Sequence, residues 1–511
     1  MNKILTYLIF SFLSFSSFGQ NEKDIGMSFK LSIAPKMQES FGGSGKLMVH
    51  ITLKNNKQPR GLSANQDSTW VFGLNIKNWK KDEILELDSN ANWTSTANWT
   101  LNNIPYRNYY LQVIWDESRI EDRAEYPHRM STKVLELTNE KPQEVSAEFF
   151  EGGWKRKLAE HELIKKFSLE SKLLSKWWDK PTNIKAAVLL PSGYADNPTK
   201  KYPVCYSIGG YGSRYIRVNQ IVRDSTLNAW WTSEDAPQVI TVFLDGYGQF
   251  GDSYQLNSEN NGPYGTALIE EIIPAIDKTY RSEGTSNTRY TAGCSTGGWV
   301  SLALQLYYPD YFGGCFSYSA DPVSFYKMQL INIYQDKNAF YTNNSIERPS
   351  KRNTMGEPEF SIKKEVQTEN VEGYTNSYIT SRNQWGGWNA VYSPKDKNGF
   401  PKPIFDPITG EIDTLVAEHW KKYDLLKYTQ ENWSELGPKV QGKIHIWMGD
   451  MDNYYLNNAM RDFDEYLQST TSPKSDAEIV FSPTCGHCEN YSIRTYLEAI
   501  QKQMITKPKL H

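Results

Sequence analysis

A glycine-flanked serine constrains this chain more than any other feature. Gly293-Cys294-Ser295-Thr296-Gly297 has the spacing G-x-S-x-G, in which the two glycines let a strand turn sharply into a helix. Residues 289–292 alternate as a buried strand does, and residues 299–307 form an apolar helical run that ends before Pro309. A strand-to-helix turn without catalysis would satisfy the same spacing. Its flanks nevertheless favour a nucleophile elbow, with Ser295 as the candidate nucleophile.

The sequence around this motif alternates between strand and helix patterns. Strands are expected at residues 184–191, 202–208, 238–244, 314–319, 443–448 and 478–481. A helix is expected at residues 266–280, where apolar residues fall on one face. This alternation predicts a doubly wound, mostly parallel α/β sheet over residues 175–511, with Ser295 at the end of a middle strand.

The N-terminal part of the chain has a different pattern. Residues 28–150 contain short, regularly spaced strand patterns separated by polar turns, which predict an all-β sandwich domain. Within it, Asn92-Trp-Thr and Asn98-Trp-Thr form a local repeat, expected as a turn with packed tryptophans or, alternatively, as a carbohydrate-contacting tip. Residues 151–174 are charged with helical periodicity, and we expect them to form a helical connector.

Residues 1–19 have the features of a secretory signal peptide, with Lys3 before an apolar run and small residues before Gln20. That run is shorter than the ~20 residues of a membrane span, and no cysteine follows it for a lipid anchor. The mature protein is therefore expected to be secreted or periplasmic, without a membrane anchor and able to keep disulfides.

The charge pattern argues against several classes of partner. The 511 residues carry a net charge of -3 with acidic and basic residues interleaved, so no basic stripe indicates nucleic acid. The glycine loop at residues 208–212 lacks the G-x-G-x-x-G of a dinucleotide site, and we expect no cofactor and no metal. Aromatic residues make up 14% of the chain and suit a cleft for sugar rings or aromatic acyl groups. The sequence indicates no oligomeric state.

A catalytic serine needs a base and an acid, which follow it in the order Ser, Asp or Glu, His in this type of sheet. His487 lies on a glycine-containing loop just after the strand at residues 478–481, whereas His445 lies inside a strand. Two acids follow the strand at residues 443–448. We favour Asp452 as the acid and keep Asp450 as the second choice, in a helix-capping role.

Backbone amides are expected to form the oxyanion hole. The amide of Thr296 directly follows the nucleophile, and a second amide is expected from the loop after the strand at residues 202–208. The second donor is expected to be Tyr211, or Gly210 if the loop shifts by one residue.

Two of the five cysteines adjoin the proposed triad. Cys294 precedes Ser295, and Cys488 follows His487, so a hydrogen bond between the serine and the histidine would bring these cysteines within bridging distance. We predict a Cys294–Cys488 disulfide. The alternative is a local pair of Cys485 and Cys488, bridged or metal-bound, although no further metal ligands cluster nearby.

A long insertion separates the strands at residues 314–319 and 443–448. It spans residues 322–440 and contains Trp385-Gly-Gly-Trp388 and a helical pattern at residues 414–433. Loops at the carboxyl ends of the strands build the sites of α/β sheets, so we expect the insertion to act as a lid over the nucleophile. The alternative is a subdomain without a role in the site.

From residue 173 onward the chain resembles the putative esterase family of α/β hydrolases, of the esterase D and feruloyl esterase type. The resembling segments are residues 186–194, 202–204, 262–265, 270–274, 290–298 and 308–312. The resemblance implies that Ser295 is the nucleophile, Asp452 the acid and His487 the base. Relatives often carry His-Gly-Gly where this chain has Ile208-Gly209-Gly210. The Cys-Ser and His-Cys pairs also resemble the tannase group, in which a disulfide joins them.

These observations predict a secreted serine hydrolase that cleaves carboxylic esters through an acyl-enzyme. Secretion, aromatic content and the resemblance suggest acyl or feruloyl groups on polysaccharides as substrates. The alternatives are a serine peptidase on the same fold and a noncatalytic carbohydrate-binding protein that retains the scaffold.

Overall fold

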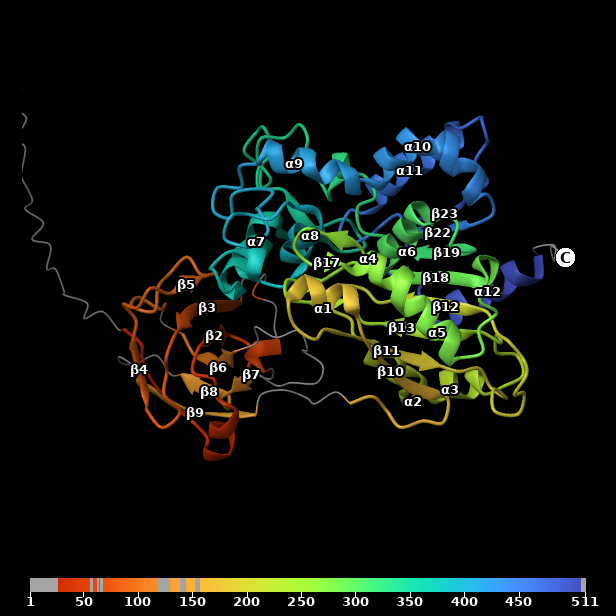
Figure 1. The fold of residues 1–511 in the computed structure, drawn as a ribbon. Helices are drawn as coiled ribbons and strands as arrows, with labels where there is room; N and C mark the ends of the chain where they lie inside the picture. Colours follow the sequence, from red (N-terminus) through yellow and green to blue (C-terminus); the bar gives the residue numbers. More distant parts are fainter. Residues whose placement is uncertain are drawn as a thin grey trace, which may run out of the picture.

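The computed structural model describes residues 26–55, 58–61, 64, 68–105, 107–117, 129–137, 144–151 and 157–506. The predicted signal peptide, residues 1–19, lies outside the described residues. Figure 1 shows a β-rich N-terminal part beside a larger part in which helices pack around a second sheet. None of the helices in the described ranges has the length and apolar character needed to cross a bilayer.

The larger part is built on one eight-stranded sheet, with the order β10-β11-β13-β12-β18-β19-β22-β23. Its strands are β10 (Ile164–Glu170), β11 (Asn183–Leu189), β12 (Val204–Ile208), β13 (Ile240–Leu244), β18 (Arg289–Cys294), β19 (Gly314–Tyr318), β22 (Ile444–Gly449) and β23 (Glu478–Ser482). The six strands from β13 to β23 in this order are parallel, whereas β10 and β11 pair antiparallel. This is the α/β-hydrolase arrangement, and the predicted fold class is confirmed.

Both faces of the sheet are covered, which explains the apolar runs seen in the sequence. Every residue of β12, β13, β18 and β19 is buried. On one face pack α6 (Thr296–Tyr307) and the helical segment that includes α5 (Ile273–Thr279), and on the other packs α12 (Ile493–Thr506). The sheet is therefore the rigid layer from which the loops at its carboxyl edge extend.

The N-terminal part is all-β, as predicted, but its strands form one continuous sheet. Its strands are β1 (Ser28–Ile33), β2 (Gly45–Thr52), β3 (Thr69–Ile76), β4 (Leu85–Asp88), β5 (Thr94–Ser95), β6 (Tyr109–Asp116), β7 (Arg129–Ser131), β8 (Leu135–Leu137) and β9 (Glu144–Glu151). Strand β7 pairs with both β6 and β9 and so joins the two halves. The sheet curls so that Phe29, Val49 and Trp115, from three different strands, share one core.

The predicted helical connector at residues 151–174 is wrong where the structure describes it. Residues Ile164–Glu170 form β10, which pairs along its length with β11, and helix α1 (Lys172–Trp178) begins only afterwards. Ile164 and Phe167 are buried, and their spacing of three resembles a helical pattern. Pairing with the open edge of β11 therefore outweighs local propensity.

The insertion between β19 and β22 contains four α-helices and two short strands and contacts both parts of the molecule. It contains β20 (Pro349–Arg352), β21 (Pro358–Ser361), α7 (Ile362–Glu372), α8 (Gln384–Tyr392), α9 (Thr414–Trp420) and α10 (Leu425–Val440). The helix expected at residues 414–433 is thus two helices, because Asp424 caps the start of α10 with a 3.0 Å bond from the Lys427 amide. Figure 1 shows α7 beside the N-terminal sheet, where Val371 packs against Met48 and Val71.

Candidate active site

Ser295 lies on a strained turn between β18 and α6. Its φ of 61° and ψ of -126° are unusual for a residue with a side chain. The turn needs its glycines, because a Cβ on Gly293 would lie 2.5 Å from the Ile208 carbonyl oxygen and one on Gly297 only 2.2 Å from it. The sequence thus folds into the sharp elbow that its spacing predicts, at the carboxyl edge of the sheet.

His487 and Asp452 meet at the same edge of the sheet, on the loops that follow β23 and β22. Nδ1 of His487 lies 2.7 Å from Oδ2 of Asp452, which is fully buried. The other Asp452 oxygen accepts the amides of Tyr454 at 2.9 Å and Leu456 at 3.3 Å. Since a carboxylate only accepts hydrogen bonds, Nδ1 carries the proton and Nε2 of the neutral ring is left as the basic nitrogen.

Asp450, the second choice for the acid, points elsewhere. Its carboxylate pairs with the exposed guanidinium of Arg461 at 2.6 Å. Arg352 of the insertion instead holds the loop between the two acids, donating to the Asp452 carbonyl at 2.9 Å and to the Asp450 carbonyl at 3.1 Å. Of the two candidates, Asp452 is therefore the one in contact with His487.

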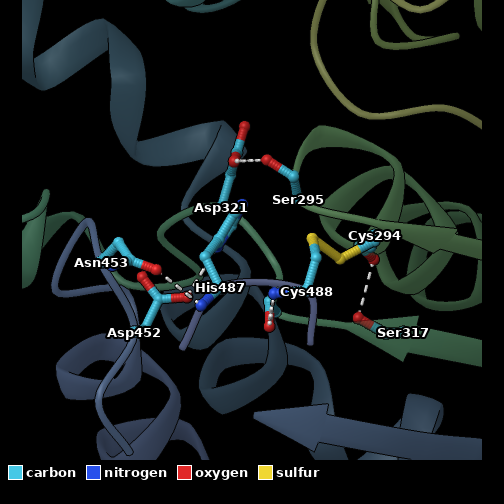
Figure 2. Close-up of a disulfide and its surroundings, with 10 residues drawn as sticks. Cys294, Ser295, Ser317, Asp321, Asp452, Asn453, His487 and Cys488 are labelled. Atoms are coloured by element: carbon cyan, nitrogen blue, oxygen red, sulfur yellow. Dashed lines mark hydrogen bonds and ion pairs between the residues drawn. A yellow bond between two sulfur atoms is a disulfide. The ribbon is translucent and has the colours of Figure 1, made fainter. Parts of the chain in front are cut away.

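The hydroxyl of Ser295 contacts a carboxylate that the sequence analysis did not identify. Ser295 Oγ donates to Oδ1 of Asp321 at 3.4 Å, and no hydrogen bond within the described residues joins it to His487. Figure 2 shows this contact beside the His487–Asp452 pair. Asp321 follows β19, the strand next to the nucleophile's own strand. A polar residue at that position is the one sequence signal that could have identified it.

Asp321 is buried, and its carboxylate accepts hydrogen bonds from uncharged donors. Its Oδ2 accepts hydrogen bonds from the Tyr254 hydroxyl at 2.6 Å, Thr296 Oγ1 at 2.9 Å, Trp388 Nε1 at 3.2 Å and Gln384 Nε2 at 3.4 Å. Burial raises the pKa of Asp321 above its ordinary value, although the hydrogen bonds from Tyr254, Thr296 and Trp388 and the charge of His487 lower it. Asp321 is thus fixed in place beside the nucleophile.

The Trp385-Gly-Gly-Trp388 motif forms part of α8, and the side chains of its two tryptophans donate to two different acids. Trp388 donates to Asp321, and Trp385 Nε1 donates to Oε2 of Glu365 at 3.2 Å. A Cβ on Gly387 would lie 2.6 Å from the Tyr211 ring, so the glycine lets α8 approach the loop after β12. The sequence marked this motif as unusual but did not indicate its acidic partners.

A pocket of about 300 Å³ opens over Ser295 and His487. It is lined by Tyr211, Ser295, Asp321, Gln329, Glu365, Gln384, Trp388, Tyr454, Leu456 and His487. Four of these, Gln329, Glu365, Gln384 and Trp388, come from the insertion, which therefore forms part of the pocket wall. A lid role for the insertion stays a prediction. In the described part of the chain, no group of three His, Cys, Asp or Glu side chains is arranged to hold a metal ion.

Two of the residues predicted to form the oxyanion hole, Thr296 and Gly210, lie beside the nucleophile. Thr296 is the first residue of α6, where helix amides lack intrahelical partners. The backbone at Gly210 passes close by, because a Cβ built there would lie 3.5 Å from the Ser295 Cβ. Tyr211 is held through its hydroxyl, which donates to the Arg382 carbonyl at 2.8 Å. The choice between the Gly210 and Tyr211 amides stays a prediction.

A disulfide joins the nucleophile's strand to the histidine loop, and Figure 2 shows it between the two segments. It links Cys294 and Cys488, whose Cα atoms are 6.1 Å apart, within the usual range for disulfides. The Cys488 amide also donates to Ser319 Oγ at 3.0 Å. Cys205, Cys315 and Cys485 are free thiols. The His487 loop is thus held against the strands that carry Ser295 and Asp321.

Two carboxylates set the charge state of His487. Burial lowers the pKa of its imidazole, but the charge and hydrogen bond of Asp452, together with the charge of Asp321, outweigh this effect. The net result is a pKa above the ordinary value of 6.5.

Comparisons with known proteins give one family model and several distantly similar structures. Residues 180–394 match the family model described as Putative esterase. A ferulic acid esterase structure is 16% identical, with a TM-score of 0.40, and the match covers 67% of this chain and 97% of that one. Fluorophosphonate-binding serine hydrolase F of Staphylococcus aureus is 12% identical, with a TM-score of 0.39 and coverages of 66% and 97%. An S-formylglutathione hydrolase from Agrobacterium tumefaciens is 12% identical, with a TM-score of 0.38 and coverages of 66% and 93%. A search of curated protein sequences finds no significant match.

Proposed function

We propose that this chain, whose residues 180–394 match the putative esterase family, is a serine esterase that hydrolyses carboxylic esters through Ser295, His487 and Asp452. The observation that carries the proposal is the meeting of a strained serine and a histidine–carboxylate pair in one pocket. The histidine is on a different loop from the serine, and the disulfide ties the two segments together.

The reaction begins when the Ser295 hydroxyl leaves Asp321 and turns toward Nε2 of His487. Nε2 takes the hydroxyl proton as Oγ attacks the ester carbonyl carbon, and the carbonyl oxygen becomes an oxyanion bound by backbone amides. His487 then gives the proton to the leaving alcohol, and an acyl-enzyme remains on Ser295. Water, deprotonated by His487, releases the acid and restores the serine. Asp452 holds the imidazole in the required tautomer throughout.

The substrates we propose are acyl or feruloyl esters on polysaccharides. The pocket supports this choice because Tyr211, Trp388 and Tyr454 provide aromatic surface, and its volume suits one aromatic acyl group or sugar unit. We propose further that the protein is secreted or periplasmic. The Cys294–Cys488 disulfide supports an oxidising compartment, where such bonds persist.

A panel of esters and peptides tests this function. The purified protein should hydrolyse p-nitrophenyl acetate, and among acetylated, feruloylated and glucuronoyl ester substrates it should favour the acetylated or feruloylated ones. A peptide amide panel is measured alongside. Cleavage of peptides at rates above those of the esters would replace the esterase proposal with a peptidase.

A further inference from the structure

A second cavity, which we call the junction cleft, lies between the N-terminal sheet and the insertion. Its volume is about 550 Å³. Its lining includes Trp70, Trp99, Arg107 and Tyr109 from the N-terminal part, and Lys364 and Gln367 from the insertion. It is thus larger than the pocket over Ser295 and contains none of the proposed catalytic residues.

Helix α7 separates the junction cleft from the active-site pocket. Lys364 lines the cleft, and the next residue, Glu365, lines the pocket. Successive residues on a helix point in directions about 100° apart, and a helix with its side chains is only about 10–12 Å across. A ligand in the cleft therefore lies one helix width from the catalytic pocket.

The walls of the cleft are held together by contacts between the two parts of the chain. Lys364 Nζ donates to the Thr96 carbonyl at 3.0 Å. Farther along, Lys46 Nζ donates to Asn376 Oδ1 at 2.6 Å and to the Gly373 carbonyl at 3.1 Å. Both parts therefore contribute to one built site.

Aromatic side chains form one wall of the cleft. The rings of Trp70 and Trp99 lie 5.4 Å apart, edge to face, and the Tyr109 ring lies 6.3 Å from each. Trp99 belongs to the second Asn-Trp-Thr repeat, whereas Trp93 of the first repeat packs on Phe29 at 5.6 Å. Only the second repeat therefore contributes its tryptophan to the cleft lining. Flat aromatic faces with a negative quadrupole suit the C–H faces of sugar rings.

The charge of the cleft is the opposite of that in the catalytic pocket. Its charged lining residues are Arg107, which is exposed, and Lys364, and none of the described residues that line it is acidic. The pocket over Ser295 carries Asp321 and Glu365, with no lysine or arginine among its lining residues. The positive charge among the described lining residues of the cleft therefore favours anions there.

We propose that the junction cleft binds an acidic glycan, with sugar rings against Trp70 and Trp99 and a carboxylate or sulfate group against Arg107 and Lys364. The further step, that this glycan is the polymer carrying the ester, rests on the proposed function. The junction cleft holds an acidic stretch of the glycan, and the neighbouring esterified sugar unit enters the active-site pocket on the other side of α7.

Binding to ester-free polymers tests the cleft separately from catalysis. Polygalacturonate supplies carboxylates, dextran sulfate supplies sulfates, and dextran is the neutral control. Binding of the full chain is measured by affinity electrophoresis in 50 mM NaCl, where the Debye screening length is roughly 14 Å. We expect one acidic polymer to bind and dextran to bind weakly or not at all. Arg107→Gln should weaken acidic binding about fivefold, as loss of an exposed ion pair implies, and Arg107→Gln with Lys364→Gln should weaken it further.

Lys77→Gln removes one positive charge from an exposed position of the same sheet region and is the matched control. It should bind like the wild type. The proposal is overturned if dextran binds as tightly as both acidic polymers, if no polymer binds, or if Lys77→Gln loses as much affinity as Arg107→Gln.

Hydrolysis of p-nitrophenyl acetate is measured separately. If it is absent while acidic binding persists, the esterase proposal fails and the cleft proposal stands; the reverse result rejects only the cleft.

Discussion

Ser295 Oγ donates its hydrogen bond to Asp321, 3.4 Å away, rather than to His487. Asp321 also contributes to the raised pKa of His487, so it acts on both the nucleophile and the base. In the resting geometry Ser295 donates to a carboxylate whose other oxygen accepts hydrogen bonds from four further donors. Catalysis therefore requires the serine side chain to rotate away from Asp321.

Asp321→Asn should move the acid limb of the pH–rate profile to lower pH. The substitution removes a negative charge that favours the protonated imidazole, so the pKa of His487 falls. The measurement is kcat/KM for p-nitrophenyl acetate against pH, compared with the wild type. A role of Asp321 in packing alone would reduce the rate at all pH values and leave the limb in place.

The wild-type protein should lose activity on the acid side at a pH above 6.5, the ordinary pKa of histidine. His487 accepts a proton only when it is neutral, and its raised pKa keeps it protonated to a higher pH than a free imidazole. Activity should therefore rise with pH through the raised value. An acid limb at or below 6.5 would contradict the proposed surroundings of His487.

Asp452→Asn should lower kcat by about 10⁴, because the histidine loses the partner that fixes its tautomer. Asp450→Asn is the matched control, two residues away on the same loop, and pairs with an exposed arginine instead. Its activity should stay near that of the wild type. Equal losses of kcat in the two variants would show that the conformation of the loop, rather than the Asp452 carboxylate that contacts His487, determines the rate.

Cys488→Ser should destabilise the protein by about 2–5 kcal/mol, the usual effect of removing a native disulfide. It should also reduce ester hydrolysis, since the bond ties the His487 loop to the strand of Ser295. Cys485→Ser, a free thiol on the same loop, is the control. Thermal unfolding and kcat are measured for both. Similar values for the two variants would argue against a role for the tether.

The sequence predicted the parts of this site that follow from local pattern. The elbow depends on glycines whose positions are visible in the chain, and His487 and Asp452 follow late strands in a known order. Asp321 and Glu365 could not be found in the same way. Asp321 accepts from Tyr254, which precedes the elbow in the chain, and from Trp388 of α8. Glu365 accepts from Trp385 of α8, so only the folded chain brings these donors to the two acids.

The incorrect predictions about the fold have the same origin. Strand β10 has buried residues three apart and looks helical, but the open edge of β11 decides its structure. The all-β character of the N-terminal part follows from its strand patterns, whereas the pairing of β7 with two neighbours, which makes one sheet of them, depends on contacts distant in sequence. Long-range pairing of this kind leaves no periodic signal in the chain.

Hydrolysis of p-nitrophenyl acetate by Ser295→Ala tests the central claim most directly. The Ser295 Oγ atom is the one proposed to form the acyl-enzyme bond. Its removal should therefore lower kcat by roughly 10⁶ while the protein still folds. Circular dichroism on the same preparation checks the fold. A folded Ser295→Ala protein that hydrolyses the ester at the wild-type rate would contradict the assignment of Ser295 as the nucleophile.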